Sequence, residues 1–589
     1  MQKYPSIPLA QTVVRLCDSF SIQRVVICPG SRNAPLTNGF VSHPNFITYS
    51  IVDERAAAFF ALGMGQQLMH PVALVCTSGS ALLNFYPAIA EAFYSDIPLV
   101  ILSADRMPHS IDIGEGQTIR QKNVFSPHVE AEASLLPDVI HATSTLIANP
   151  LQTLVAEATD QKTIEAIQLK HQQQNEKEIA RVLSAAIKQQ GPVHLNIPLE
   201  EPLYEMTKNA LSVKKYPIPK KKEAVSESEM ATCKTLWHST PNKWVIIGQM
   251  APNQLDEEWI TQLCNDPSVV VFSETTSNVF LKKGIASIDT LMAPLEQIMD
   301  DSHDITPSIL LTFGGMVVSK KIKAFLRKNQ PEHHWHVDPK KAYNTYYCLN
   351  QHFKCTANAF FKSLYTNFSS QSNSTFQPSV LKVYNAFKQK GQEYINTLPF
   401  SDFYVFKTLA AVLPSSYHLQ VANSSSIRYT QLLDWPKGIQ FFSNRGTSGI
   451  DGSTATAVGA AQINPLPTLL ITGDLSFFYD VNGLWNNHVP SNFKIILINN
   501  NGGGIFRILP GEKDTSTFDT YFETLHERKA KYIAKAFNFE YQHVHSKWKL
   551  KQKLTRFFAD GKRPKIIEIE TPRQLNDQVL LNYFKSMTN

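Results

Sequence analysis

The sequence predicts an α/β fold of three consecutive domains with mainly parallel sheets. Two observations lead to this prediction. Short apolar runs, typical of buried strands, alternate with helical stretches along the whole chain. The length of 589 residues also exceeds what one hydrophobic core supports and indicates several domains. Since ligands of parallel α/β sheets bind at the carboxyl ends of strands, the residues directly after the apolar runs are the candidate site residues.

The first block, residues 1–203, contains the clearest patterns. The run RVVICPG (24–30) is an apolar strand followed by a Pro-Gly turn. Residues 72–105 have the pattern strand, glycine turn, helix and strand, which is a βαβ unit. A polar helix is expected over 163–190, followed by the short strand GPVHLNIP (191–198). We expect this block to be one domain.

Two further blocks repeat this pattern. Residues 204–376 begin with a linker at 204–230 that contains Pro, Lys and Ser, and end in a polar stretch at 367–377. The expected strands of this second block lie at 243–249, 268–274, 308–315 and 333–339. Residues 377–589 form the third block, with expected strands at 417–426, 468–474, 493–500 and 563–571. Three α/β domains therefore follow one another along the chain.

Composition argues against several classes of protein. The formal charge of +6 is small for the length, and scattered basic residues speak against nucleic-acid binding but suit small anionic substrates. The seven cysteines form no CxxC pair and are odd in number, which favours reduced thiols over disulfides or a zinc site. No apolar window is long enough for a membrane span, and the N-terminus lacks the pattern of a signal peptide. We therefore expect a cytoplasmic protein.

An acidic residue, Asp474, directly follows the apolar strand TLLITG. Such an Asp often caps the next helix, but a carboxylate at a sheet edge also suits a bound cation. The next expected strand ends in INNNGGG, which brings Asn500 and the glycines at 502–504 to the same edge. Asp474, Asn500 and the Gly502 carbonyl are hard oxygen ligands of the kind that Mg²⁺ prefers, and glycines let a diphosphate approach the backbone. No P-loop motif occurs in the sequence.

This pairing of GD with NN resembles the diphosphate and Mg²⁺ site of thiamine-diphosphate (ThDP) enzymes. Such enzymes also need a glutamate from another domain, and the stretch SIVDERAAAFFALG (50–63) offers Glu54. A buried carboxyl group that is hydrogen-bonded to the aminopyrimidine of the cofactor favours the tautomer that removes the C2 proton. Taken alone, Glu54 could instead be a helix-start acid or a partner of Arg55.

Eight motifs together resemble one family more closely, the SEPHCHC synthases of the menaquinone pathway (2-succinyl-5-enolpyruvyl-6-hydroxy-3-cyclohexene-1-carboxylate synthases). The motifs are CPGSRNAPL, DERAAAFFALG, TSGSALLNFYPAIAEA, LSADR, GEGQTIRQ, SNRGTSGIDG, GDLSFFYDVNGL and NNNGGGIF, in order over the first and third blocks. The resemblance implies a ThDP-binding fold with pyrimidine, central and diphosphate domains. It implies ThDP and Mg²⁺, with Mn²⁺ as a substitute, as the cofactors.

The reaction that this resemblance implies is a transfer between two small acids. The substrate 2-oxoglutarate is decarboxylated, and the resulting succinyl carbanion adds in a 1,4 sense to isochorismate to give SEPHCHC. The resemblance also implies a homodimer or homotetramer with active sites at the subunit interface, in which Glu54 of one subunit meets the cofactor held by Asp474 of another. Neither a nucleic-acid partner nor a membrane span is expected.

The same resemblance assigns residues to the cofactor and the metal. It implies that Glu54 is the catalytic residue and that Asp474, Asn500 and Gly502 are the metal ligands. Ile450 matches the bulky residue over which the cofactor bends in this family. The implied cofactor-binding residues are Glu54, Ile450, Gly473, Asp474, Leu475, Ser476, Asn500, Gly502, Gly503 and Ile505.

Both implied substrates are dianions, so a pocket for them needs fixed cations, preferably arginines. The resemblance assigns to substrate binding Ser31, Arg32, Arg106, Gln117, Lys320, Ser424, Arg428, Arg445, Phe506 and Leu509. A single arginine at a strand end is usually structural, but four within these motifs favour binding. Ile505, Phe506 and Leu509 are expected to form an apolar wall, with core packing as the alternative for Leu509. Lys320-Lys321 departs from the family's Lys-Arg pair, so a solvated helix face is the alternative there.

Three other functions stay open at this point. Another ThDP-dependent 2-oxo-acid decarboxylase or carboligase would need a flavin-binding middle domain or a pocket for uncharged 2-oxo acids, and the four arginines argue against it. A dinucleotide-dependent dehydrogenase would need a GxGxxG turn, which opens none of the expected helices. A non-catalytic relative would not be expected to keep Glu54, Asp474, Asn500 and the arginines together.

Overall fold

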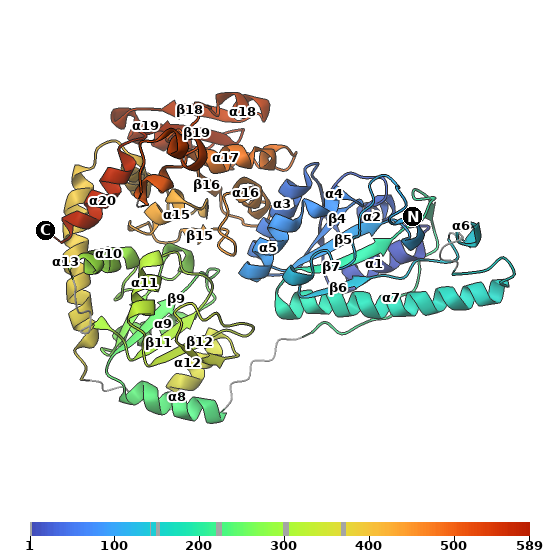
Figure 1. The fold of residues 1–589 in the computed structure, drawn as a ribbon, viewed down its shortest axis with the longest axis horizontal. Coiled ribbons are helices and arrows are strands. Elements are labelled where there is room, and N and C mark those ends of the chain that lie inside the picture. The colour runs from blue at the N-terminus through green and yellow to red at the C-terminus, as the bar shows by residue number, and fades with distance from the viewer. Residues whose placement is uncertain are drawn as a thin grey trace. The chain divides into compact units, whose positions relative to one another are not determined.

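The computed structural model describes residues 3–141, 143–148, 154–219, 227–298, 305–366, 373–509 and 511–588. Three parallel sheets with helices packed around them form the predicted three-domain α/β fold (Figure 1). By compactness the chain divides into two units. The N-terminal unit comprises Met1–Lys221, Gly446–Pro465 and Asp480–Pro490, and the C-terminal unit comprises Lys222–Arg445, Leu466–Tyr479 and Ser491–Asn589.

The first sheet lies in the N-terminal unit and has six parallel strands in the order β3-β2-β4-β5-β7-β6. The strands are β2 (Arg24–Ile27), β3 (Ile47–Ser50), β4 (Val72–Cys76), β5 (Leu99–Asp105), β6 (Ala131–Ser134) and β7 (Val193–Pro198). Every residue of β4, β5 and β7 is buried, as expected for central parallel strands covered on both faces. A short antiparallel pair joins β1 (Tyr4–Pro5) to β8 (Met206–Thr207).

Helices from two parts of the chain belong to this unit. Those of the first block are α1 (Pro8–Ser19), α2 (Ala34–Ser42), α3 (Glu54–Leu68), α4 (Ser80–Leu83), α5 (Tyr86–Ser95), α6 (Thr143–Ala148) and α7 (Gln161–Gln189). Helix α16 (Ser453–Ala460) comes from the third block and packs against α3. A Cβ atom added at Gly63 would lie 2.0 Å from the Thr456 carbonyl oxygen, and one at Gly459 would lie 1.9 Å from the Phe60 carbonyl oxygen. The two helices therefore approach this closely only because both positions are glycine.

The middle sheet lies in the C-terminal unit and has five parallel strands in the order β10-β9-β11-β12-β13. They are β9 (Lys243–Ile247), β10 (Val269–Phe272), β11 (Ile309–Phe313), β12 (His333–Val337) and β13 (Leu349–Phe353). The helices of this part are α8 (Glu227–Ser239), α9 (Glu257–Asn265), α10 (Ile288–Ile298), α11 (Lys320–Lys328) and α12 (Ala357–Tyr365). The Ser319 side chain accepts a hydrogen bond from the backbone of Ile322 and so caps α11.

The third sheet also lies in the C-terminal unit, with six parallel strands in the order β15-β14-β16-β17-β19-β18. They are β14 (His418–Val421), β15 (Gln440–Phe442), β16 (Thr468–Gly473), β17 (Lys494–Asn499), β18 (Glu540–Val544) and β19 (Lys565–Glu570). The helices are α13 (Phe376–Thr397), α14 (Asp402–Val412), α15 (Ser425–Thr430), α17 (Asp474–Tyr479), α18 (Lys531–Ala536), α19 (Lys547–Phe558) and α20 (Asn576–Ser586). The central strands β16 and β17 end at the same sheet edge, which places Asp474 beside the loop that follows Asn499.

Most expected elements are present, and the missed ones share a position. Every strand expected from an apolar run exists, and α7 confirms the expected polar helix. The strands that the apolar pattern did not predict are β1, β3, β6, β8, β13, β15 and β18. Five of them are edge strands of the parallel sheets, and β1 and β8 form the short antiparallel pair. Edge strands face solvent on one side and are short or polar, so they lack the apolar run of a central strand. Residues 220–226 of the expected linker and 367–372 of the expected polar stretch lie outside the described residues, and α8 already begins at Glu227.

Two expectations about side chains and membranes can also be compared with the structure. All seven cysteines are unpaired, as the sequence predicts. Among the described residues, none of the helices has the length and apolar character that crossing a membrane requires. The domain boundaries at 203/204 and 376/377 stay predictions.

Candidate active site

Glu54 is the first residue of α3 in the N-terminal unit, but it is not the residue that caps this helix. The Asp53 carboxylate accepts a hydrogen bond of 3.0 Å from the backbone of Ala56. Its other oxygen accepts one of 2.7 Å from the Asn482 side chain. Asp53 therefore caps α3, and Glu54 stands in the first turn of the helix, which is the position of the alternative helix-start acid.

Two buried thiols lie near the Glu54 carboxylate. Cys28 follows β2 and Cys76 ends β4, and both are buried. Burial raises the pKa of the Cys76 thiol, and the charge of Glu54 raises it further. Burial likewise raises the pKa of Cys28, with additional contributions from Cys76, Glu54 and Asp53. Both thiols are therefore neutral, so Glu54 stands beside a surface of low polarity at the carboxyl ends of two central strands.

Asp474 connects the ends of β16 and β17 in the C-terminal unit. One carboxylate oxygen accepts a 2.7 Å hydrogen bond from the backbone of Leu475, and the other accepts one of 3.0 Å from the backbone of Gly502. The residue is only 3% exposed. His526 Nε2 lies 3.4 Å from the same oxygen that Gly502 contacts. Burying a carboxylate costs free energy unless hydrogen-bond donors or cations surround it, and the backbone donors at this sheet edge offset part of that cost.

Asn500 is buried close to this carboxylate and is oriented by a second acid, Asp402. The Asn500 amide nitrogen donates a 2.9 Å hydrogen bond to Asp402, whose other oxygen accepts a 2.6 Å bond from the Thr571 hydroxyl. Burial raises the pKa of Asp402 to about 6, although the hydrogen bonds from Thr571 and Asn500 oppose this shift. At neutral pH Asp402 is therefore ionised and accepts from the amide nitrogen, which leaves the Asn500 amide oxygen for another partner.

The glycines after Asn500 are required by backbone conformation and by close contacts. Gly502 has φ of +154°, and a Cβ atom there would lie 2.6 Å from the Glu523 carbonyl oxygen. The Gly502 carbonyl accepts a 3.0 Å hydrogen bond from the backbone of Gly504 and keeps a second lone pair. At Gly473, a Cβ atom would meet no atom within 4 Å, so space is open beside the end of β16.

This donor set fits a hard divalent cation that a phosphate-bearing cofactor helps to bind. It offers the Asp474 carboxylate, the Asn500 amide oxygen and the Gly502 carbonyl, which are oxygen ligands of the kind Mg²⁺ takes. In the part of the chain that the structure describes, no group of three or more His, Cys, Asp or Glu side chains could hold a metal by itself. A cation here would therefore complete its shell with water or phosphate oxygens, for which the space beside Gly473 is available.

Buried ion pairs hold the loop that carries the predicted apolar residues. Arg507 donates two hydrogen bonds of 2.6 Å to Glu523, and Arg573 donates a third, of 3.0 Å. The side chains of Phe506 and Leu509 remain 36% and 49% exposed. Leu509 therefore does not pack into the core, which was its alternative role.

Two of the predicted arginines lie in the N-terminal unit and bind backbone carbonyls there. Arg32 is buried and donates a 3.0 Å hydrogen bond to the Leu199 carbonyl, with Glu201 at 3.4 Å. Arg106 donates a 2.9 Å hydrogen bond to the Gly116 carbonyl. These contacts give both arginines a structural role. Two further predicted residues of this unit, Ser31 and Gln117, are exposed.

The other two arginines lie in the C-terminal unit. Arg445 donates a 2.7 Å hydrogen bond to the Asn423 side chain. Burial lowers the pKa of the Arg428 guanidinium, and the charge of Asp289 opposes this shift. Ser424, also predicted, precedes α15 with a positive φ of 69°. Partly desolvated guanidinium groups of this kind bind carboxylates more strongly than exposed ones do.

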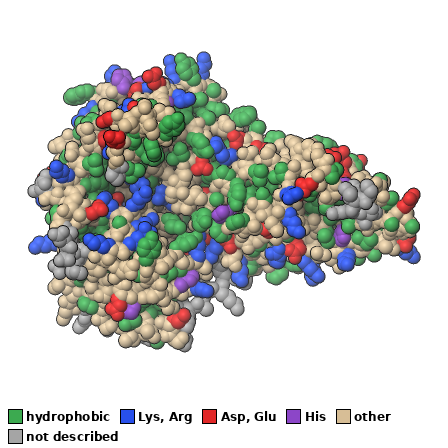
Figure 2. Space-filling model, in the orientation of Figure 1, with side chains coloured by type: hydrophobic (Ala, Val, Ile, Leu, Met, Phe, Trp, Pro, Cys, Tyr) green, Lys and Arg blue, Asp and Glu red, His purple; other side chains and the backbone are tan. Residues whose placement is uncertain are grey.

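Lysines of α11 add to this positive region. Lys320 is exposed, whereas Lys321 lies 2.5 Å from Glu296, so the predicted pair has two different environments. Lys323, one helical turn after Lys320, was not predicted. Burial lowers the pKa of Lys323, Glu274 opposes this shift, and the charges of Arg445 and Lys320 add to it. Figure 2 shows Lys and Arg side chains gathered on the C-terminal unit around α11 and α15.

A buried acid organises the start of α11. Glu274 accepts hydrogen bonds of 2.7 and 2.8 Å from the backbones of Val318 and Ser319. Burial raises the pKa of Glu274 to about 7, while these two hydrogen bonds and the charge of Arg445 oppose the shift. Lys320, Lys323 and Arg445 therefore lie close enough to affect one another's charge. An anionic ligand bound here would balance their positive charges.

The turn before Ile450 is fixed by Glu91 within the N-terminal unit. The Glu91 carboxylate accepts hydrogen bonds of 2.7 and 2.6 Å from the backbones of Gly446 and Thr447. The Ile450 side chain is 40% exposed. An apolar side chain on a turn held this firmly is suited to support a ligand.

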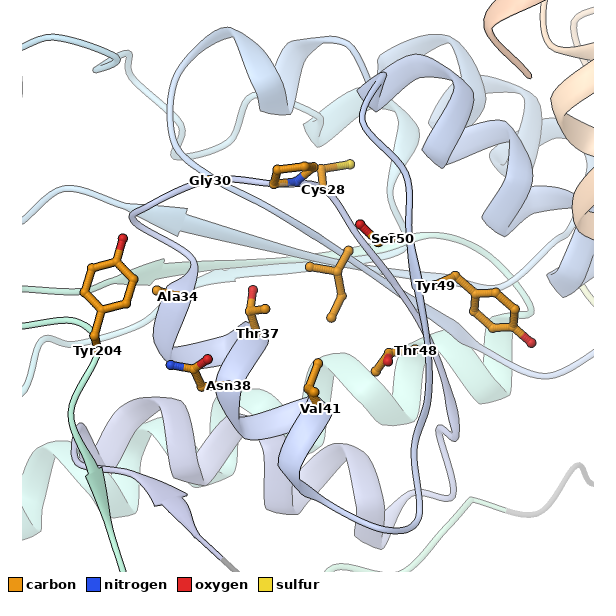
Figure 3. A pocket seen from close by; sticks show the side chains of 12 residues that line it. Cys28, Gly30, Ala34, Thr37, Asn38, Val41, Thr48, Tyr49, Ser50 and Tyr204 are labelled. Carbon is orange, nitrogen blue, oxygen red and sulfur yellow. The ribbon is translucent and has the colours of Figure 1, made fainter. Parts of the chain in front are cut away.

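A cavity of about 290 Å³ opens beside the ends of β2 and β3 (Figure 3). Its lining is neutral and comes from β2, α2, β3 and Tyr204. None of the predicted site residues lines it, although Cys28 and Gly30 directly precede Ser31. Cys28, one of the two thiols near Glu54, is the group that this cavity shares with the residues described above.

The structure thus groups the predicted residues in each unit and adds others to which the sequence assigned no role. Asp474 contacts Gly502 directly, and both Lys320 and Arg445 lie close enough to Lys323 to shift its pKa. The residues that sequence reasoning missed are Glu91, Glu274, Lys323, Asp402, Glu523 and His526. Two of them carried a sequence signal. Lys323 lies three residues after Lys320 on the same helix face, and Glu91 lies inside the motif TSGSALLNFYPAIAEA.

Comparison with known families agrees with this geometry. Three family models match the chain: the N-terminal TPP binding domain of thiamine pyrophosphate enzymes over residues 7–128, the middle domain of thiamine pyrophosphate over 214–421, and the C-terminal TPP binding domain over 424–569. The fold and the site therefore define a thiamine pyrophosphate enzyme.

Curated relatives show which family of thiamine pyrophosphate enzymes the chain resembles. A protein of Christiangramia forsetii is 48% identical over 99% of this chain and all of its own length, and one of Flavobacterium psychrophilum is 48% identical with the same coverage. A Porphyromonas gingivalis protein is 34% identical over 96% of this chain and 94% of its own. Each is named 2-succinyl-5-enolpyruvyl-6-hydroxy-3-cyclohexene-1-carboxylate synthase. The chain belongs to this synthase family.

Proposed function

We propose that this enzyme decarboxylates 2-oxoglutarate with ThDP and Mg²⁺ and transfers the succinyl unit to isochorismate, which forms SEPHCHC for menaquinone biosynthesis. The observation that carries the proposal is the combination of Asp474, Asn500 and Gly502 at one sheet edge with the charged region of Arg445, Lys320 and Lys323. The names of the full-length relatives support the same reaction.

We assign the following residues to the metal and the cofactor. Asp474, Asn500 and the Gly502 carbonyl hold the cation, for which Mn²⁺ is a substitute. The remaining residues proposed to contact the cofactor are Ile450, Gly473, Leu475, Ser476, Gly503 and Ile505. When bound, ThDP supplies a carbon acid that attacks 2-oxo acids and stabilises the product of decarboxylation. Glu54 holds the proton that the aminopyrimidine needs, and the neutral thiols beside it keep its surroundings apolar.

Substrate binding is assigned to side chains that match two dianions. Arg32, Arg106, Arg428, Arg445 and Lys320 are proposed to bind carboxylates, because fixed guanidinium groups recognise them in two-point contacts. The proposed polar contacts are Ser31, Gln117 and Ser424. Phe506 and Leu509, which remain exposed on the loop after β17, are proposed to exclude water from the reacting carbon.

The assembly and the location of the protein are part of the same proposal. We propose a homodimer or homotetramer in which Glu54 of one subunit serves the cofactor held by Asp474 of the other. The pyrimidine, central and diphosphate domains are proposed to span 1–203, 204–376 and 377–589. Seven unpaired thiols support a cytoplasmic location.

The deciding experiment follows isochorismate by its absorbance with purified protein, 2-oxoglutarate, ThDP and Mg²⁺. We expect consumption that needs every component and that is lost in Glu54→Gln. Decarboxylation of 2-oxoglutarate without loss of isochorismate would remove the assigned acceptor. No reaction in folded protein that binds ThDP would overturn both substrate assignments.

The subunit arrangement has a separate test. Glu54→Gln and Asp474→Ala proteins, each inactive alone, are mixed, dissociated and reassembled. If the two residues act in one site from different subunits, part of the activity returns in mixed dimers. Complete absence of complementation in reassembled dimers would contradict the arrangement.

A further inference from the structure

Two buried side chains outside the recognised motifs contact the two side-chain ligands of the proposed cation site. Asp402, the first residue of α14, contacts Asn500, and His526, in the loop before α18, contacts Asp474. All four residues lie in the C-terminal unit and are buried. Asp402 and His526 therefore each lie behind one of the two side-chain ligands.

The contact with Asp402 decides which end of the Asn500 amide faces the cation. The Asn500 amide nitrogen donates a 2.9 Å hydrogen bond to one Asp402 oxygen, so the NH₂ end of the amide faces Asp402. Asp402 cannot rotate away, because Thr571 donates a 2.6 Å bond to its other oxygen and Asn576 accepts a 2.8 Å bond from its backbone. The amide oxygen of Asn500 is consequently the end left for a metal ion.

The contact with His526 acts on the Asp474 carboxylate. The backbone of Arg528 donates a 3.1 Å hydrogen bond to His526 Nδ1, so this nitrogen carries no proton and Nε2 carries it in the neutral ring. Nε2 faces the Asp474 oxygen at 3.4 Å, and the His526 ring packs edge-on against Phe478 with centroids 5.6 Å apart. The ring therefore places a buried nitrogen, which forms no hydrogen bond among the described residues, beside one carboxylate oxygen.

We propose that Asp402 and His526 are positioning residues that hold the Asn500 amide oxygen and the Asp474 carboxylate in the orientation that binds the divalent cation. This inference rests on the cation site of the proposed function. Groups that orient metal ligands commonly change metal affinity by about 10- to 100-fold when they are replaced. The effect is expected on the affinity for the metal, with little effect on stability.

The test measures Mn²⁺ binding to the full-length protein with saturating ThDP, using the electron paramagnetic resonance signal of free Mn²⁺. His526→Phe keeps the ring and its packing but loses the donor, and His526→Gln restores a donor near the position of Nε2. Asp402→Asn keeps the shape but lets the Asn500 amide turn over. The matched control is His545→Phe, which replaces an exposed histidine of the same unit.

We expect the Mn²⁺ dissociation constant to rise about 10-fold or more in His526→Phe and Asp402→Asn, to stay near the wild-type value in His545→Phe, and to recover largely in His526→Gln. Activity of His526→Phe should return at saturating Mn²⁺. Asp474→Asn is measured beside them. Normal binding by His526→Phe and Asp402→Asn, with binding lost in Asp474→Asn, would overturn the positioning role alone. Normal binding by Asp474→Asn as well would overturn the cation site and this inference together.

Discussion

The first and third sheets share one strand order but carry different residues at their strand ends. Numbered along the chain within each sheet, both have the order second, first, third, fourth, sixth and fifth. In both, a helix follows the second strand, α3 in one case and α16 in the other, and these two helices pack on each other. The shared topology fixes where a site can form, and the residues at the strand ends fix its chemistry.

The difference is clearest after the third strand of each sheet. There β4 ends in Cys76 and is followed by Thr77, whereas β16 ends in Gly473 and is followed by Asp474. The first position carries neutral groups, and the second carries a buried charge. In the first domain the acid comes instead at the start of the preceding helix, as Glu54. In the proposed function, the same architecture places Glu54 at the aminopyrimidine of the cofactor and Asp474 at the cation.

The largest expected effect is at the third strand end. Asp474→Asn should lower the rate of isochorismate consumption roughly 1000-fold, because it removes the negative charge that attracts the cation. The matched change in the first domain is Thr77→Val, because the buried Thr77 hydroxyl oxygen has no hydrogen-bond partner among the residues that the structure describes. It should leave the rate within about threefold, since no charge or hydrogen bond is lost. Equal losses in the two variants would show that the two strand ends do not differ in role.

A buried network of ion pairs holds the loop that follows the fourth strand of the third domain. In the third domain, Glu523 receives Arg507 and Arg573 in a buried network, so Glu523→Gln should lower the free energy of unfolding by about 3–5 kcal/mol. The control is Glu178→Gln, which breaks the exposed pair with Arg181 and should cost less than about 1 kcal/mol. Urea denaturation measures both. Similarly small losses of unfolding free energy in the two variants would mean that the network does not stabilise the loop after β17.

The fold was predictable because central parallel strands are continuous apolar runs, as in TLLITG and KIILIN, whatever surrounds them. Edge strands such as β18, with the sequence EYQHV, follow no such pattern, and only pairing with β19 reveals them. The site shows a similar division. Asp474, Asn500 and Gly502 lie in short motifs, so their chemistry is visible in the sequence.

The residues that orient this site could not be predicted in the same way. Asp402 and His526 come from other elements of the chain, and only the folded structure brings them to Asn500 and Asp474. Glu91 reaches the turn before Ile450 across even more of the sequence. An isolated Asp, His or Glu in a helix or loop is chemically ordinary, so its role depends on tertiary contacts that no local pattern encodes.

The ends of the fourth strands predict different pH dependences. Burial raises the pKa of Asp105 to about 6, while hydrogen bonds from Asn196 and from the Arg106 backbone oppose this shift. At the equivalent strand end, Asn499 does not titrate. The folded protein binds the Asp105 proton more tightly than the unfolded chain does, so this group's contribution to stability falls as pH rises from about 4 to about 6.

Asp105→Asn should remove that fall. Relative to wild type, its free energy of unfolding should increase by up to about 3 kcal/mol between pH 4 and pH 7, measured by denaturant titration at each pH. The control is Asp112→Asn, which replaces the exposed partner of Arg120 and should follow the wild-type pH profile. A constant difference between Asp105→Asn and wild type over this range would contradict the raised pKa.

The smallest effect tests the contact between the two equivalent helices. In Gly63→Ala the new Cβ atom meets the Thr456 carbonyl oxygen, so α3 and α16 must separate. Overpacking costs about 1–3 kcal/mol, and the better helix propensity of alanine returns about 1 kcal/mol, which leaves a net loss of roughly 1–2 kcal/mol. Gly116→Ala, where the Cβ atom meets nothing within 4 Å, is the control and should be neutral.

Combining Gly63→Ala with Gly459→Ala sharpens this last prediction. Each Cβ atom meets a backbone oxygen of the opposite helix at the same crossing, so one separation of the helices relieves both clashes. The double variant should therefore lose less stability than the sum of the two single losses, by about 0.5 kcal/mol or more. Additive losses would mean that each glycine is needed only for its own local backbone, and that the two helices do not share one close contact.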